Sequence, residues 1–217
     1  MKTLEAQPKL VEQVHKAILA EIAEGKLASG ERIIQEQIAH ELGVSRQPVQ
    51  QALVLLKNQG VLRDAPGRGL LVAPLDPQFV RQMYEIRAVI EGLAFRKAAE
   101  HFTEKAKTRG KQLLDAGREA VRKGSVSEMI AADMAFHTFI YALADNPLIG
   151  PAMETQWINT QRVMGSVLLS ADKPRDIWDE HEAMFALVAS GDGQRAEQAA
   201  RQHLDEAADF MTERVDR

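Results

Sequence analysis

Histidine and aspartate side chains interrupt the apolar faces of three segments that the sequence predicts to be helices. In the segment 126–144, an apolar stripe with helical spacing contains Asp133 and His137, one turn apart. In the segments 174–190 and 193–214, His181 and His203 take equivalent places. A buried polar group without a partner costs roughly 1–3 kcal/mol, so these groups need a shared partner. A metal ion between the three helices would satisfy all four side chains.

Three imidazoles and one carboxylate form a donor set for a divalent metal ion. Zinc is the expected ion, and nickel, iron, cobalt or manganese are alternatives for the same donors. The chain has no cysteine, so no thiolate ligand is available. The competing interpretation makes each histidine an ordinary core residue that is hydrogen-bonded to its neighbours. Three such residues, with a carboxylate beside one of them, favour the metal site.

A charged pair lies on the inner stripe of a helix predicted at 78–101. Arg87 and Glu91 stand one turn apart among apolar residues. An arginine that points into a cavity can bind a carboxylate through two hydrogen bonds, which makes Arg87 a candidate for effector binding. The alternative is an internal ion pair between the two side chains that ties the bundle together. The residues alone leave both interpretations open.

A segment that begins at Ser45 has the residue types and spacing of a DNA-binding helix. A helix with a buried apolar stripe presents Arg46 and Gln50 on its outer face, and Gln47 and Gln51 share that polar side. Arginine can bind guanine, and glutamine can bind adenine, through paired hydrogen bonds in the major groove. Ser45 and the helix N-terminus are suited to a phosphate. The alternative is an ordinary solvent-exposed helix face.

A glycine-rich turn follows between two short predicted strands, 61–63 and 70–72. The turn runs from Asp64 to Gly69 and places Arg68 between two glycines. An arginine at the tip of such a hairpin can enter a minor groove. Arg68 and Gly69 are therefore candidate DNA contacts.

The elements that position these residues fall into two groups, and the predicted fold class is mostly α. Three helices, at about 9–24, 35–42 and 45–59, and the two-stranded hairpin predict an N-terminal winged helix-turn-helix domain over residues 1–74. The stretch 75–78 is expected to be a linker. Residues 79–217 are expected to form an all-α bundle. Its six helices are predicted at about 78–101, 104–123, 126–144, 149–170, 174–190 and 193–214.

Composition and charge narrow the class of protein. The 217 residues carry a net charge of −4, but residues 42–75 hold four basic side chains against a single acidic one. A local basic segment in an acidic chain is typical of a DNA-reading module beside an acidic partner domain. No apolar run is long enough to span a membrane, and the N-terminus lacks the apolar core of a secretory signal. We therefore expect a cytoplasmic protein with no membrane partner.

The N-terminal motifs resemble the DNA-binding domain of the GntR family. The similarity covers about residues 9–74, and its most specific part is the run Gly-Val-Ser-Arg-Gln-Pro-Val at 43–49. Arg46 and Arg68 match the family pattern. Family members usually carry Arg-Glu after Pro-Val, and this Arg contacts operator DNA, whereas this chain has Gln-Gln at 50–51. The resemblance therefore implies a DNA-binding protein whose operator departs from the usual sequence.

The C-terminal half resembles the FCD domain, the effector-binding bundle of FadR-type GntR regulators, in its shorter VanR-like form. The similarity spans about residues 78–214 and rests on the motifs Glu85-Ile86-Arg87 with Glu91, Asp133-x-x-Phe136-His137 with Asn146, Glu180-His181, and His203-Leu204. In that family one Asp and three His bind a metal ion, and a small carboxylate binds beside it. The resemblance implies one divalent ion per chain, with Arg87 near the carboxylate and with four ligands: Asp133, His137, His181 and His203.

The expected function is a metabolite-responsive transcription regulator. The resemblance implies a homodimer that binds a double-stranded DNA operator, most often as a repressor, and that responds to a small carboxylate. Two alternatives compete with it: a constitutive DNA binder with a purely structural metal site, and a helical metallohydrolase in which the metal activates water. No motif places a general base for hydrolysis, so we expect that the chain is not an enzyme.

Overall fold

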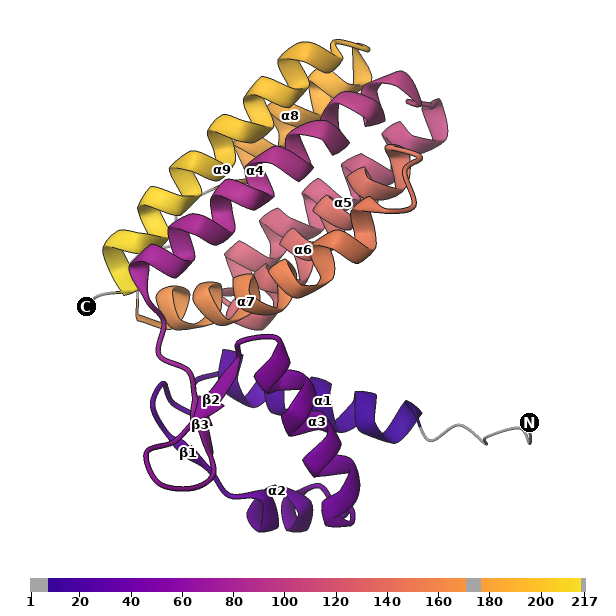
Figure 1. The fold of residues 1–217 in the computed structure, drawn as a ribbon. Helices are drawn as coiled ribbons and strands as arrows, with labels where there is room; N and C mark the ends of the chain where they lie inside the picture. Colours follow the sequence, from indigo (N-terminus) through magenta and orange to yellow (C-terminus); the bar gives the residue numbers. More distant parts are fainter. Residues whose placement is uncertain (1–7, 171–176, 216–217) are drawn as a thin grey trace. The chain divides into compact units, whose positions relative to one another are not determined.

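The computed structural model describes residues 8–170 and 177–215 and divides the chain into two compact units, Met1–Leu75 and Asp76–Arg217 (Figure 1). Each unit buries its own set of apolar side chains and is described by itself. None of the helices in the described residues is both long and apolar enough to cross a membrane.

The N-terminal unit contains the helices of a winged helix-turn-helix: α1 (Pro8–Ala23), α2 (Gln35–Glu41) and α3 (Arg46–Asn58). Val14 and Ile18 of α1 are buried, as are Val49 and Leu53 of α3, so the apolar stripes that the sequence predicts face inward. Gly43 lies between α2 and α3 with a φ of 63°, in the left-handed region that favours glycine. This residue permits the sharp turn between the two helices.

The wing contains three strands rather than the two that the sequence predicts: β1 (Arg32–Ile33), β2 (Leu62–Asp64) and β3 (Leu70–Val72). The strand order is β1-β3-β2, and both pairings are antiparallel. Leu71 of β3 pairs with Arg63 on one side and with Arg32 on the other. A strand of two residues shows no alternation of apolar and polar side chains, which is why the sequence gives no sign of β1.

Within the described residues, the C-terminal unit consists of six helices: α4 (Pro77–Glu100), α5 (Glu104–Lys123), α6 (Val126–Leu143), α7 (Ile149–Ser170), α8 (Trp178–Ala189) and α9 (Gly193–Val215). The mostly α fold class, with a winged domain followed by an all-α bundle, is thus confirmed.

Side chains at the helix ends explain where several of these helices begin. Thr103 and Ser125 accept hydrogen bonds from the backbone N–H groups of Ala106 and Glu128, so both are the N-caps that the sequence predicts. Asp76 caps α4 in the same way, and Pro77 is its first residue. The helix therefore begins at Pro77, inside the stretch 75–78 that the sequence predicts as a linker.

The predicted helix 174–190 corresponds to α8, which begins at Trp178, with Ile177 at its N-cap. The predicted residues 174–176 and the predicted break at Lys173-Pro174 lie outside the described residues.

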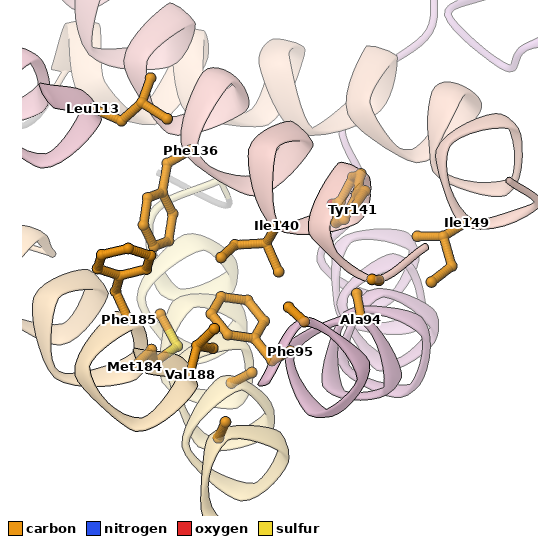
Figure 2. Close-up of a cluster of buried hydrophobic side chains, with 14 of the residues drawn as sticks. Ala94, Phe95, Leu113, Phe136, Ile140, Tyr141, Ile149, Met184, Phe185 and Val188 are labelled. Carbon is orange, nitrogen blue, oxygen red and sulfur yellow. The ribbon is translucent and has the colours of Figure 1, made fainter. Parts of the chain in front are cut away.

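Helices α4 and α9 run antiparallel and side by side along the bundle (Figure 1). Ion pairs tie them at opposite ends: Arg81 to Asp209 at 2.8 Å, and Arg96 to Glu197 at 3.0 Å. Figure 2 shows part of the core that α4 shares with the other helices, where Phe95, Phe136, Ile140, Met184 and Phe185 gather among further apolar side chains.

Two glycines let α5 approach α8 closely. A Cβ at Gly110 would overlap the ring of Phe185, and a Cβ at Gly117 would overlap the ring of Trp178. The rings fill the space that a side chain would otherwise take. The position of α8, which carries His181, therefore depends on these two glycines.

Candidate metal centre and nucleic-acid interface

Three histidines from three different helices converge inside the C-terminal unit. His137 of α6, His181 of α8 and His203 of α9 are all buried, and each offers a ring nitrogen within 4.8 Å of the others. The Nε2 atoms of His181 and His203 are 3.3 Å apart. Each histidine sits on the apolar stripe of its helix, so burying the three stripes against one another brings the imidazoles together.

Asp133 borders the three histidines from α6. Its Oδ1 lies 3.5 Å from Nε2 of His181 and 3.8 Å from Nε2 of His137. Its place one turn before His137 accounts for this position. The structure thus brings together all four residues that the sequence singled out as metal ligands.

The donor atoms of this cluster fit a metal ion. Among the described residues, Nε2 of His137 is fully buried and forms no hydrogen bond. An unpaired buried nitrogen is costly, and a cation would satisfy it together with its neighbours. Three imidazole nitrogens and one carboxylate oxygen match the donors of zinc and of several other divalent transition metals.

Two further carboxylates hold the outward-facing nitrogens of the same imidazoles. Oε2 of Glu180 accepts a hydrogen bond of 2.7 Å from Nδ1 of His203. Oε2 of Glu91 contacts Nδ1 of His137. A carboxylate that accepts the Nδ1 proton fixes the ring orientation and leaves the lone pair of Nε2 for a metal ion. This arrangement is common around protein-bound metals. Neither role was predicted from the sequence, where Glu91 stands one turn after Arg87 and Glu180 comes just before His181 in a motif shared with the FCD domain.

Arg87 forms the internal pair that the sequence analysis held open as one interpretation. Its Nε donates to Oε1 of Glu91 at 2.7 Å, and its Nη1 donates to Oγ1 of Thr160 at 3.2 Å. The guanidinium also lies over the rings of Trp157, at 4.5 Å, and Tyr84, at 5.0 Å. Arg87 nevertheless lines a cavity, so its pairing with Glu91 does not remove it from the site of a possible ligand.

The charges of these buried groups depend on one another. Burial by itself would raise the pKa of Glu91, but Arg87 and then His137 lower it to about 2, so the carboxylate is charged. Burial would lower the pKa of Arg87, yet the charge of Glu91 raises it above the ordinary value. Burial raises the pKa of Tyr84 to about 12 and lowers that of Arg162, a second buried arginine, to about 10. The tyrosine is therefore neutral at physiological pH.

A cavity of about 60 Å³ lies against the cluster of Asp133 and the three histidines. Its polar lining consists of Tyr84, Arg87, Asp133 and His203, two of which belong to the predicted ligand set. The rest of its lining is apolar and comes from α5, α6, α7, α8 and α9, or from Ile177 just before α8. A small molecule in this cavity would meet Asp133, His203 and Arg87 at the same time.

The predicted DNA-reading residues of α3 are exposed together. Arg46, Gln47, Gln50 and Gln51 lie on the outer face of the helix, and Ser45 occupies its N-cap position. The hydroxyl of Ser45 forms no capping bond, so it is not needed to begin the helix. Sequence periodicity therefore separated the two faces of α3 correctly.

Arg46 has a partner within its own unit. Its Nη1 lies 3.1 Å from Oε1 of Glu36 on α2, and its backbone carbonyl accepts a hydrogen bond of 2.8 Å from Nε2 of Gln35. About two thirds of the Arg46 side chain stays exposed, at 69%. An exposed ion pair of this kind contributes little to stability and can exchange for a contact with DNA.

The tip of the wing is held by an arginine that the sequence analysis did not single out. Nη1 of Arg32 donates to the carbonyl of Arg68 at 3.0 Å, and its Nη2 donates to the carbonyl of Pro66 at 2.6 Å. Gly67 and Gly69 have φ values of 90° and 89°, which fold the turn around Arg68. The side chain of Arg68 remains exposed. Arg32 is more than 30 residues away in the sequence, so no local pattern reveals the contact.

Comparison with known proteins gives matches to both units. The family model for the FCD domain matches residues 82–206, and the model for bacterial regulatory proteins of the gntR family matches residues 10–72. The HTH-type transcriptional repressor RspR of Escherichia coli K12 is 26% identical over 200 residues, which cover 92% of this chain and 88% of that protein. The HTH-type transcriptional regulator McbR of the same organism is 27% identical over 181 residues, which cover 82% and 80%.

A solved structure of E. coli McbR shares the fold. It superposes with a TM-score of 0.81 at 22% identity, covering 94% of this chain and 97% of that one.

Proposed function

The chain belongs to the gntR family of bacterial regulatory proteins, in the branch that carries an FCD domain, and from this membership we propose that it is a metabolite-responsive repressor. Its winged domain binds a DNA operator, and its helical bundle holds one divalent metal ion and senses a small carboxylate. The family consists of transcription regulators rather than enzymes, and the relative RspR, 26% identical to this chain, is a transcriptional repressor.

One observation carries the sensing part of this proposal. Asp133 and three histidines meet beside a cavity that Arg87 also lines. A purely structural metal site needs no cavity at its edge, whereas a sensor needs room for a ligand next to its polar groups. The adjacency of cluster, arginine and cavity therefore favours a sensor over a structural site.

We propose that His137, His181, His203 and Asp133 hold the metal ion. The ion, when bound, supplies a positive centre that can accept a carboxylate oxygen. Zinc fits the donors best, and nickel, iron, cobalt or manganese fit them as well. Glu91 and Glu180 orient the imidazoles of His137 and His203, so that the ligand nitrogens stay in place when a small molecule enters.

Arg87 is the proposed carboxylate clamp. Its Nε is engaged by Glu91, while the guanidinium remains part of the cavity wall. The Glu91 contact fixes the orientation of the planar guanidinium before any ligand arrives, which reduces the cost of ordering it on binding. For such binding to regulate, the carboxylate must bind the DNA-competent and DNA-incompetent states with different affinities.

The DNA-binding part of the proposal assigns base contacts to α3 and a minor-groove contact to the wing. Arg46, Gln47, Gln50 and Gln51 are placed to read bases in the major groove, and Ser45 to bind a phosphate. Arg68, beside Gly69, would enter the minor groove. Two copies in a homodimer would read a pseudo-palindrome with half-sites about one DNA turn apart.

The test combines three measurements on one preparation. DNA that the protein selects from a random-sequence pool serves as operator, and its affinity is measured by fluorescence anisotropy with and without zinc and a panel of small carboxylates. We expect one metal ion per chain by elemental analysis, and an operator affinity that at least one carboxylate changes when zinc is present. An affinity that no carboxylate changes in the zinc-loaded protein would leave the structural-metal alternative in place.

Matched variants separate the two activities. His181→Ala combined with His203→Ala should abolish tight metal binding, whereas His101→Ala, at an exposed position, should retain it. Arg46→Ala should reduce discrimination between operator and random DNA by about 1–3 kcal/mol, the scale of one paired base contact. Arg195→Ala, an exposed arginine of α9, is the control and should leave this discrimination unchanged.

A further inference from the structure

The cavity beside the metal cluster has chemically different ends. Asp133 and His203 both lie beside His181, and Arg87 is joined through Glu91 to His137, so the three lining residues form one polar end. The ring of Tyr84 lies against the Arg87 guanidinium there. Apolar side chains line the remainder. A ligand that fits such a cavity is itself polar at one end and apolar at the other.

Helix geometry gives the direction and length of the apolar part. On α9 the lining runs from His203 to Met211, eight residues or about 12 Å along the helix axis. On α6 it runs back one turn, from Asp133 to Met129. Since α4 and α9 are antiparallel and tied by the Arg81–Asp209 pair, the apolar part extends from the cluster toward the end of the bundle where that pair lies.

Charge limits the number of acidic groups that the ligand carries. Of the described residues that line the cavity, Arg87 is the one with a permanent positive charge. A second carboxylate at the far end of the ligand would lie against Met129, Phe210 and Met211, whose side chains offer no cation or N–H donor. The nearby Arg214 does not line the cavity, and its guanidinium stacks on the Phe210 ring and donates to the Phe210 carbonyl. Methionines at this end adapt their shape to an aliphatic or an aromatic body.

We infer that the effector is a monocarboxylate with an apolar body of several carbon atoms, bound with its carboxylate at the Arg87 end and its body along α9 toward Met211. This inference rests on the proposed sensing function and narrows it to one class of acid. It separates such acids from short acids and from dicarboxylates of equal length.

The experiment is isothermal titration of the zinc-loaded full chain with acetate, butyrate, hexanoate and adipate. Each buried methylene is expected to raise the affinity about fourfold, so hexanoate should bind far more tightly than acetate. Adipate has the same number of carbon atoms as hexanoate and should bind at least about tenfold more weakly, because its second carboxylate loses its water. Phenylacetate should bind within about tenfold of hexanoate, since the methionines adapt to a ring.

Two variants test the direction of binding. Met211→Gln should weaken hexanoate about tenfold and leave acetate unchanged. Met134→Gln, on the same bundle but outside the cavity lining, is the control and should change neither affinity. Ala207→Leu adds only apolar volume to the cavity wall and should exclude hexanoate while acetate still binds, which keeps the test decisive if Met211→Gln does not fold.

The outcomes separate this inference from the proposed function. If none of the acids binds to the zinc-loaded chain, the sensing function itself fails, and the inference fails with it. If acetate or adipate binds as tightly as hexanoate, the proposed sensing function is retained, but the inference about its ligand class is overturned. A gain in affinity with chain length that Met211→Gln removes and Met134→Gln retains supports the inference.

Discussion

His203 and His137 each turn Nδ1 toward a carboxylate and Nε2 toward the other side chains of the cluster. Glu180 accepts from Nδ1 of His203, and Glu91 contacts Nδ1 of His137. Glu91 is fully buried and already paired with Arg87, so changing it would leave a buried positive charge without its partner. Glu180 is partly exposed, which makes it the better residue with which to test the outer contacts.

Glu180→Gln is expected to weaken zinc binding by about 10–100-fold without preventing folding. The amide is less basic than the carboxylate and holds the His203 imidazole less firmly. Zinc affinity is measured by competition with a chelating dye. Glu182→Gln removes a carboxylate from the same helix, one that pairs with Arg118 on the surface, and should leave zinc affinity unchanged. An equal effect of both variants would show that charge alone, rather than the contact with His203, sets the affinity.

That these four side chains converge was predictable from sequence, because each one interrupts an apolar stripe at helical spacing. Asp133, His137, His181 and His203 needed only the period of their own helices. The carboxylates that contact the outer nitrogens of these histidines were not predictable in the same way. Glu180 contacts a histidine 23 residues away on another helix. Such a contact depends on the angle at which the two helices pack, which the spacing of residues within either helix does not reveal.

At the scale of elements, α5 and α8 pack closely because α5 has glycine, with no side chain, at two positions that face α8. Gly110 and Gly117 are seven residues apart and therefore on one face of α5, where they receive the rings of Phe185 and Trp178. Trp178 lines the cavity, and His181 lies one turn further along α8. Helix contact and site geometry thus depend on the same small residues.

Gly117→Ala is expected to lower the free energy of unfolding by about 1–3 kcal/mol, because the added methyl group overlaps the Trp178 ring. Urea unfolding followed by circular dichroism measures this change. Gly150→Ala in α7 is the control, since a Cβ there meets no atom within 4 Å. It should raise the free energy of unfolding by about 0.4–1 kcal/mol through helix propensity and a less flexible unfolded chain. A stabilising Gly117→Ala would contradict the close contact.

The wing is a second element whose shape depends on a distant side chain. Arg32 of β1 donates to the carbonyls of Pro66 and Arg68, so the strand that the sequence analysis missed also orders the turn. The helices of this unit were predictable because glycines mark their ends and apolar spacing marks their faces. Strand β1 was not predictable, because a strand of two residues is too short to show an alternation of apolar and polar side chains.

Arg32→Ala is expected to reduce operator affinity by about tenfold, since the loss of two hydrogen bonds frees the turn that carries Arg68. Anisotropy titration with the selected DNA measures the effect. If Arg32 acts through the wing, its removal should have little further effect in an Arg68→Ala background. Additive losses in that double variant would instead mean that Arg32 contacts DNA independently of Arg68.

At the scale of the whole molecule, the two units differ in charge and in content of tryptophan. Residues 1–75 carry a net charge of +1 and residues 76–217 a net charge of −5. Both tryptophans, Trp157 and Trp178, belong to the second unit, one under Arg87 and one against the cavity. Tryptophan fluorescence therefore reports on the bundle alone, while circular dichroism reports on both units.

Removal of metal by a chelator is expected to lower the melting temperature of the bundle by about 10 °C. A ligand at 1,000 times its dissociation constant contributes about 4 kcal/mol to the folded state, and a unit of this size shifts about 2–4 °C per kcal/mol. Thermal melting followed by tryptophan fluorescence measures the shift. The variant with both His181→Ala and His203→Ala should show no response to chelator. A wild-type melting temperature that is indifferent to chelator would contradict the metal site.

The proposed ligands come from α6, α8 and α9, so a bound ion would be a cross-link between segments that are far apart in the chain. Secreted domains make such links with disulfides, but this chain has no cysteine. A link through imidazole and carboxylate has no sulfur bond to reduce, and it forms and breaks with the supply of the ion. With zinc, which has no redox chemistry, the stability of the bundle would then follow the supply of the ion and not the redox state of its surroundings.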